Sequence, residues 1–101
     1  MLLGSRQYAL NDVRVIRVNY KDWLVPGYVL LSVTATTTPA TGLSSTVGAV
    51  QLDPTEEIAF ITLHCGTVVN ESFTLNIQAK DTFGQTINDQ LNVTVVTPGT
   101  T

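Results

Sequence analysis

The strongest constraint on the fold is a regular alternation of apolar and polar residues in the last third of the chain. In segments 73–79 and 91–95 every second residue is apolar, and a stretch that contains Asp81 and Gly84 separates them. Successive side chains of a β-strand point to opposite faces, so each segment is predicted to be a strand with one buried face. Aspartate and glycine are typical of tight turns, and the whole stretch is therefore predicted to be a β-hairpin.

Four further strands are predicted upstream, at residues 13–20, 28–36, 46–52 and 57–64, and no segment has the period of a helix. In the first of them the apolar positions change from odd to even, which predicts a bulge or a strand that changes sheets. The fourth is apolar on both faces, which predicts a central or interfacial strand. Six to seven short strands separated by turns indicate an all-β fold, an antiparallel β-sandwich, with a small barrel as the alternative.

The chain is expected to form a single domain. Its 101 residues are near the commonest domain length, and 44% are hydrophobic while 13% are charged, which argues against disorder. Residues 1–12 have no clear period and are predicted to form an N-terminal arm or linker, residues 13–96 the sandwich, and residues 97–101 a C-terminal tail. A core of this size barely offsets the entropy cost of ordering the chain, so extra stabilisation by a partner is expected.

The charge balance argues against a nucleic-acid partner. Five basic and eight acidic residues give a formal net charge of −3, whereas phosphate binding requires clustered lysine and arginine. Arg14 and Arg17 are three residues apart on a predicted strand, so they are expected to lie on opposite faces. Only two leucines precede Gly4 and Arg6, too few for a signal peptide or a membrane span. We therefore expect no membrane partner, and either folding in a reducing cytosol or a fragment of a longer protein.

Residues suited to catalysis are sparse, and the chain is predicted not to be an enzyme. The one histidine, His64, precedes the one cysteine, Cys65. Neighbours on a strand project to opposite faces, so these two side chains cannot pair unless the chain turns between them. The serines lack the glycine-flanked elbow of hydrolases. Cys65 is expected to be a small core residue without an internal disulfide partner.

Metal and cofactor sites are likewise not predicted. One histidine and one cysteine fall short of the four ligands of a structural zinc site. Calcium needs at least three converging carboxylates, and the acidic residues do not group into a recognisable loop. Asp53 directly precedes Pro54 and Asp81 lies ahead of Gly84, so both are interpreted as turn residues. The acidic candidates for calcium are Asp22, Asp53, Glu56, Glu57, Asp81 and Asp89.

The aromatic residues are the best candidates for a protein interface. Tyr20, Trp23 and Tyr28 cluster around the connection after the first predicted strand, and Tyr8 lies in the predicted arm. Amphipathic rings commonly anchor a protein partner. These four residues are therefore predicted to form a partner interface. The alternative for Trp23 is a core position between the two sheets.

Two segments resemble known protein domains. The hairpin FTLNIQAKDTFGQTINDQLNVTVV combines an alternating strand, an Ala-x-Asp step, a Gly, a Thr and a second alternating strand. It resembles the closing strands of bacterial and phage immunoglobulin-like domains. The run VRVIRVNYKDWLVPGYVLLSVTAT, with its aromatic-x-Asp-Trp pattern, resembles the start of small immunoglobulin-like phage virion proteins, the fiber-tail adaptors of short-tailed phages. Together the two segments cover most of residues 13–96.

The resemblance implies an immunoglobulin-like sandwich and a non-enzymatic structural protein of the virion. Such a protein is expected to be assembled in the host cytoplasm, to form a homo-oligomer in a symmetric assembly, and to dock tail, nozzle, fiber or capsid proteins. A capsid decoration protein, or a carbohydrate- or protein-binding module of a bacterial surface adhesin, are the alternatives. A fold resemblance by itself carries no information on activity.

Overall fold

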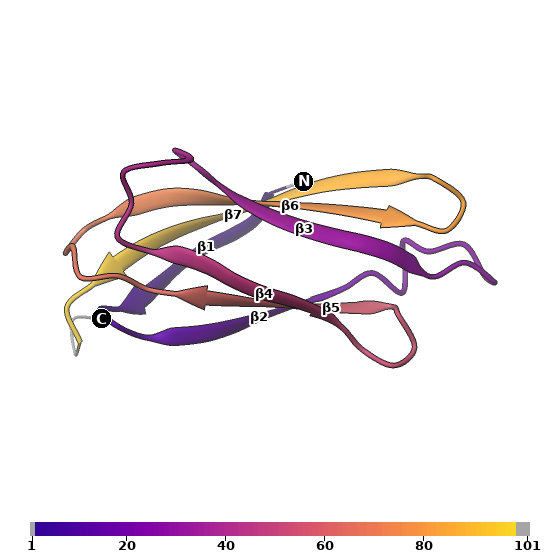
Figure 1. Ribbon diagram of the computed structural model, residues 1–101, viewed down its shortest axis with the longest axis horizontal. Coiled ribbons are helices and arrows are strands. Elements are labelled where there is room, and N and C mark those ends of the chain that lie inside the picture. Colours follow the sequence, from indigo (N-terminus) through magenta and orange to yellow (C-terminus); the bar gives the residue numbers. More distant parts are fainter. Residues whose placement is uncertain (1, 99–101) are drawn as a thin grey trace.

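Two stacked β-sheets form the fold in the computed structural model, which describes residues 2–98. One sheet has the strand order β1-β7-β6-β3 and the other has the order β2-β5-β4 (Figure 1). This arrangement confirms the predicted all-β sandwich of six to seven strands. The strands are β1 (Leu2–Ala9), β2 (Val13–Asn19), β3 (Leu30–Thr38), β4 (Thr46–Leu52), β5 (Ile58–His64), β6 (Ser72–Asp81) and β7 (Thr86–Val96).

The strand order is immunoglobulin-like. In the constant-type immunoglobulin sandwich, strands three, six and seven form one sheet, while strands one, two, four and five form the other. The present chain has the same sets, with one exception. Its first strand, β1, pairs with β7 in parallel instead of joining β2. The other strand pairs within each sheet are antiparallel.

The predicted N-terminal arm is wrong for residues 2–9, because they form strand β1 of the four-stranded sheet. Tyr8 lies opposite Val95 in the register with β7. The period is unclear in the sequence because β1 is an edge strand whose pairing shifts between Leu2 and Ser5, where Gly4 has a φ of 121°. Of the predicted C-terminal tail, residues 97–98 lie beyond β7, and residues 99–101 fall outside the described part of the chain.

The bulge or sheet change predicted for the first upstream strand is also wrong. Strand β2 keeps one continuous antiparallel register with β5 over its whole length. The apolar positions shift from odd to even numbers in the sequence because both faces of β2 carry apolar side chains. Ile16 and Val18 pack toward the core, whereas Val13 and Val15 lie on the outer face of the sheet.

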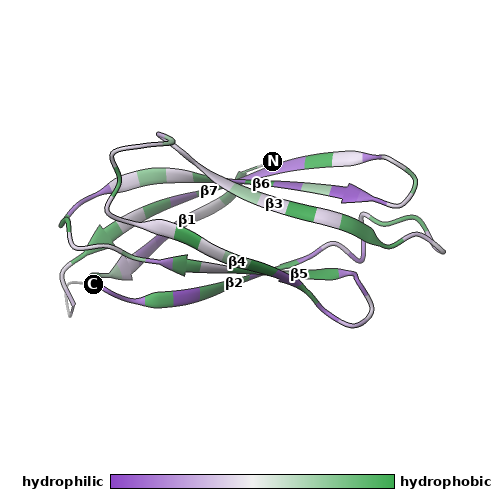
Figure 2. Cartoon of the chain, viewed as in Figure 1, coloured by the Kyte–Doolittle hydropathy of each residue, from purple (hydrophilic) through white to green (hydrophobic). Residues whose placement is uncertain are grey.

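The core lies between the two sheets and is built from the alternating positions that the sequence indicates. Strand β5 is the central strand of its sheet, as predicted, and its residues Ala59, Ile61 and Leu63 are fully buried. Leu75 and Ile77 of β6 are buried opposite them. Burial of each such large aliphatic side chain contributes about 1.5–3 kcal/mol. Figure 2 shows the alternation as bands of hydrophobic and hydrophilic residues along the strands.

The C-terminal hairpin forms as predicted, with strands β6 and β7 paired antiparallel. The Oδ1 atom of Asp81 accepts hydrogen bonds from the backbone N–H groups of Phe83, at 3.0 Å, and Gln85, at 2.8 Å. Gly84 has a φ of 92°, a left-handed conformation that favours glycine. Asp81 is therefore the turn residue that the sequence indicates.

Candidate functional site

A groove runs along the open side of the sandwich, and we call it the β1/β2 groove. It consists of two hollows, of about 300 Å³ and 340 Å³, which share Leu3, Val18 and Asn19. Apolar side chains of β1, β2 and β7 line it because edge strands leave their inward positions only partly covered. Arg6 and Arg17 line the first hollow together with Tyr8, Ile16 and Leu91, and the second hollow is completed by Tyr20, Asp22, Trp23, Ile87 and Asp89.

Three of the four aromatic residues predicted as an interface, Tyr8, Tyr20 and Trp23, line this groove. Tyr20, however, is too deeply buried to form a contact with a partner. Tyr20 is only 3% exposed and belongs to the core. Its ring packs edge-on against Trp23, with 6.0 Å between the centroids. Burial, together with the neighbouring Asp89 carboxylate, raises the pKa of the Tyr20 hydroxyl. Tyr20 is therefore a structural residue of the core that packs against Trp23.

Trp23 and Tyr8 lie at opposite ends of the groove, each only partly buried. Trp23 packs against the core and lines the second hollow, so it combines the two roles that the sequence left open. Tyr8 lines the first hollow, and the guanidinium carbon of Arg14 lies 5.5 Å from its ring centroid. Burial raises the pKa of the Tyr8 hydroxyl, an effect that Arg6 and Arg14 oppose.

Tyr28 is separate from this site. Its ring packs against Phe83 of the β6–β7 turn, with 5.0 Å between the centroids. The predicted cluster of aromatic residues around the first connection therefore splits into two groups. Phe83 is 64% exposed, and the sequence offered no signal for it beyond an aromatic residue within a turn.

The outer face of the three-stranded sheet carries exposed apolar side chains, which we call the outer apolar face. Val13 and Val15 are 60% and 61% exposed, and they pair with His64 and Thr62 of β5. Phe60 lies on the same side of β5, two residues from Thr62. The apolar character of both faces of segment 57–64 was the sequence signal for this surface. Val13 and Val15 were missed because their positions were attributed to a bulge.

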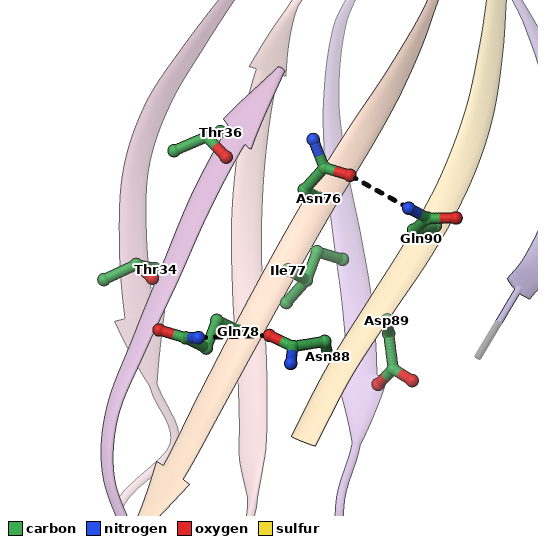
Figure 3. Close-up of a pocket in the computed structure, with 8 residues that line it drawn as sticks. All are labelled: Thr34, Thr36, Asn76, Ile77, Gln78, Asn88, Asp89 and Gln90. Atoms are coloured by element: carbon green, nitrogen blue, oxygen red, sulfur yellow. Dashed lines mark hydrogen bonds between the residues drawn. The ribbon is translucent and has the colours of Figure 1, made fainter. Parts of the chain in front are cut away.

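The outer face of the four-stranded sheet has the opposite chemistry, because it carries uncharged polar side chains. Figure 3 shows these side chains over β3, β6 and β7. Gln78 donates a hydrogen bond to Asn88 at 3.1 Å, Gln90 to Asn76 at 3.4 Å, and Asn76 to Thr38 at 2.7 Å. A shallow hollow of about 390 Å³ lies on this sheet and is lined by Thr34, Thr36, Asn76, Ile77, Gln78, Asn88, Asp89 and Gln90.

His64 and Cys65 have opposite environments. Cys65 is buried, whereas His64 is exposed at the end of β5. Burial, followed by the nearby Asp12 carboxylate, raises the pKa of the Cys65 thiol. A raised pKa keeps the sulfur protonated near neutral pH, where the thiol is a poor nucleophile.

The loops at the Cys65 end of the sandwich are joined by one carboxylate, and we call this arrangement the Glu71 clamp. Glu71 accepts hydrogen bonds of 2.7–3.1 Å from the backbone N–H and hydroxyl groups of both Ser44 and Ser45. The two hydroxyls in turn accept from the backbone N–H groups of Thr67 and Gly66. The clamp therefore fixes the β3–β4 connection to the β5–β6 connection.

Acid is expected to destabilise the fold through the clamp. Partial desolvation raises the pKa of Glu71, but the hydrogen bonds from Ser44 and Ser45 together outweigh it, so the net pKa is lowered. Hydrogen bonds likewise lower the pKa of Asp53 to about 2. A lowered pKa stabilises the folded state above the unfolded pKa, and this contribution disappears as the pH falls through the folded pKa. Urea unfolding is therefore expected to show stability falling from about pH 5 to about pH 2.

Glu71→Gln tests this origin of the acid sensitivity. We expect the free energy of unfolding of Glu71→Gln to be lower by about 1–2 kcal/mol at pH 7. Below pH 5 its free energy of unfolding should fall less steeply than that of the original chain. Glu56→Gln is the matched control, because the Glu56 carboxylate accepts no hydrogen bond within residues 2–98. An unchanged acid response in Glu71→Gln would show that the clamp does not carry this pH dependence.

The acidic residues do not converge on one point. Asp53 and Asp81 each accept backbone hydrogen bonds in their own turns, which agrees with their interpretation as turn residues. Within residues 2–98, no group of three or more His, Cys, Asp or Glu side chains could hold a metal ion. Over the same residues there is also no helix with the length and apolar character to cross a membrane.

Comparisons with known proteins identified no relative of this chain. No family model matches the chain, and no curated protein matches it in sequence.

Proposed function

We propose that this chain is a non-enzymatic structural protein of a phage particle, which docks tail or fiber components as a tail adaptor present in several symmetric copies. The sequence resemblance of residues 13–96 supports its place in a virion. One structural observation supports docking, namely the outer apolar face, where Val13 and Val15 are more than half exposed. A location in the virion and assembly in the host cytoplasm follow from the same proposal.

The outer apolar face suits a protein partner for a physical reason. Two valines lie on one edge strand of a regular sheet, and Phe60 of β5 lies diagonally across from Val15, so their side chains form adjacent rows on one face. Exposed apolar residues that adjoin one another on a soluble surface commonly mark interaction sites. Removing each valine from water would contribute about 1 kcal/mol, because it is already partly covered.

The test replaces the two valines with threonine, which keeps the β-branched shape and adds a hydroxyl. We expect the purified chain to form discrete oligomers or to co-sediment with particles, and Val13→Thr with Val15→Thr to lose this association while remaining folded. Thr34→Ser with Thr36→Ser, on the opposite face, is the matched control. A chain that stays monomeric and never sediments with particles would overturn the proposal. Micrographs of particles labelled on this chain would distinguish a tail position from capsid decoration.

A binding module of a surface adhesin is the second candidate, and the uncharged polar face favours it. The amide groups of Asn76, Gln78 and Gln90 and the hydroxyls of Thr34 and Thr36 are suited to hydrogen-bond the hydroxyls of a neutral sugar. Calorimetric titration with neutral oligosaccharides measures this directly. Saturable binding that Asn76→Ala and Gln78→Ala abolish would support the adhesin function, and the absence of binding across a glycan array would exclude it.

A further inference from the structure

We propose that the free edge of β2 receives an extended segment of a partner protein as an additional strand. This segment would place apolar side chains in the β1/β2 groove and a carboxylate beside Arg6 and Arg17. The inference rests on the proposed function, because it specifies how one docked neighbour is held. It concerns the edge and inner side of β2, whereas the proposed function concerns the outer apolar face.

Among the edge strands of residues 2–98, β2 is the one that keeps a regular register over its whole length. The sandwich has four edge strands, and β1, β3 and β4 each contain a register shift. Such irregularities are a common means by which proteins block unwanted strand addition. Strand β2 has seven residues in one unbroken register, contains no proline, and within residues 2–98 forms backbone ladder bonds only with β5. Its free edge is therefore a regular template for another strand.

The direction of the backbone groups along β2 follows from the bonds at its two ends. The N–H of Tyr20 donates to the carbonyl of Glu57 at 2.9 Å, and the N–H of Cys65 donates to the carbonyl of Asp12 at 2.8 Å. In an antiparallel pair, residues bonded to the partner alternate with residues whose backbone groups point away. Even-numbered residues of β2 therefore bond β5. The N–H and C=O groups of Val13, Val15, Arg17 and Asn19 point to the free edge.

The position beside β2 is the one that the first strand occupies in a constant-type immunoglobulin sandwich. Here β1 pairs with β7 in the other sheet, so this position has no strand of the described chain. The β1/β2 groove is the resulting opening, with hollows of about 300 Å³ and 340 Å³. An added strand would complete a four-stranded sheet and cover Leu3 and Ile16, which are only partly buried.

The dimensions indicate how long the added segment is. Seven residues of β2 span about 23 Å at the usual rise of a strand. A partner segment of about seven residues would therefore match the edge. Every second side chain would point into the groove between Tyr8 at one end and Trp23 at the other.

Charge distinguishes a partner segment from a second copy of this chain. Arg17 has no hydrogen bond or ion pair within residues 2–98, and Arg6 donates only to the neighbouring carbonyl of Ser5. Strand β2 carries two arginines and no acidic residue, so pairing of β2 with β2 of a second copy would bring like charges onto the same face of the joined sheet. A partner segment that carries glutamate or aspartate near its centre would instead place an opposite charge beside the hollow that Arg6 and Arg17 line.

The experiment uses a labelled peptide of about nine residues, in which threonine and valine alternate and the central residue is glutamate. Amide hydrogen exchange of the full chain is measured with and without this peptide. We expect slower exchange at Val13, Val15 and Arg17, and little change at Ile16, whose N–H already bonds β5. Protection at the edges of β3 or β4, or no protection anywhere, would overturn the inference.

Two sets of variants separate backbone pairing from charge. Val15→Pro removes one outward N–H and should abolish binding, since proline is tolerated on an edge strand but cannot extend the ladder. Val15→Thr keeps the N–H and is expected to bind as the original chain does. Arg17→Glu should weaken binding of the glutamate peptide by about tenfold and strengthen binding of a lysine peptide. If Val15→Pro fails to fold, the hydrogen-exchange pattern and the Arg17→Glu charge reversal still test whether the peptide pairs with β2.

Failure here is distinguishable from failure of the proposed function. Peptide binding is measured on the isolated chain, whereas the proposed function is measured by oligomerisation and co-sedimentation with particles. Co-sedimentation without peptide protection of β2 would overturn only the added strand. Protection of β2 in a chain that never associates with particles would overturn the proposed place in the virion.

Discussion

Gly66→Ala is expected to lower the free energy of unfolding by about 3 kcal/mol or more. A β-carbon at this position would lie 2.1 Å from Oγ of Ser44 and 2.4 Å from its carbonyl carbon. The backbone of Gly66 is held on both sides, because its N–H donates to Ser45 and its carbonyl accepts from Asn11. The loop therefore cannot move aside without breaking these bonds and displacing Ser44 from the Glu71 clamp.

Gly48→Ala is the matched control, and urea unfolding is the measurement. A β-carbon at Gly48 would lie 2.8 Å from Nε2 of His64. His64 is exposed, so its ring can rotate away at small cost. We therefore expect the free energy of unfolding of Gly48→Ala to change by less than about 1 kcal/mol. Equal losses in the two variants would show that the contact with Ser44 is not the cause.

Ile61→Ala is expected to lower the free energy of unfolding by about 3–4 kcal/mol, which is a large part of the stability of a domain of this size. Ile61 is fully buried at the centre of β5. Its truncation removes apolar contacts and leaves a cavity that strands on both sides prevent from closing. Ile61→Val should cost about 1 kcal/mol, since only one methylene is lost.

Val15→Thr provides the comparison on the outer apolar face. Val15 pairs with Thr62, next to Ile61 along β5, but its side chain is 61% exposed. We expect its change in unfolding free energy to stay within about 0.5 kcal/mol, because little buried surface is affected. A loss as large as that of Ile61→Ala would mean that Val15 is structural, and it would remove the reason for assigning docking to that face.

The strands themselves were largely predictable from the sequence. The alternation in segments 73–79 and 91–95 predicted β6 and β7, and the aspartate and glycine between them predicted the turn. Segment 57–64, apolar on both faces, was correctly expected to be central. In each case the evidence is local, since neighbouring side chains of a strand must point to opposite faces.

The predictions failed where edge positions obscure the pattern. β1 has no fully buried residue and a register shift near Gly4, so its period was too weak to indicate a strand. In β2, Val13 and Val15 lie on the outer face while Ile16 and Val18 lie inside, a pattern that resembles a bulge when only the sequence is read. Tyr20 was placed at an interface because its ring chemistry suits a surface, but the fold buries it.

The candidate site was likewise predictable only in part from the sequence. The sequence indicated that Tyr8 and Trp23 matter for contacts, yet the two residues are fifteen positions apart and are brought to one groove only by the pairing of β1 with β7. Arg6 and Arg17 also lie on strands of different sheets. Sequence reasoning could not join them, because the distance between strands of two sheets depends on how the sheets stack.

By itself, the sequence determined that this chain is all-β with a hairpin at its end, because the period of two and the turn residues follow from local backbone geometry, and it favoured a sandwich over a small barrel. Only the tertiary structure decided that β1 joins β7, that β2 keeps an open and regular edge, and that a groove lies between them. Those features arise from hydrogen bonds and packing between segments that are far apart in the chain, and a local pattern carries no record of such contacts.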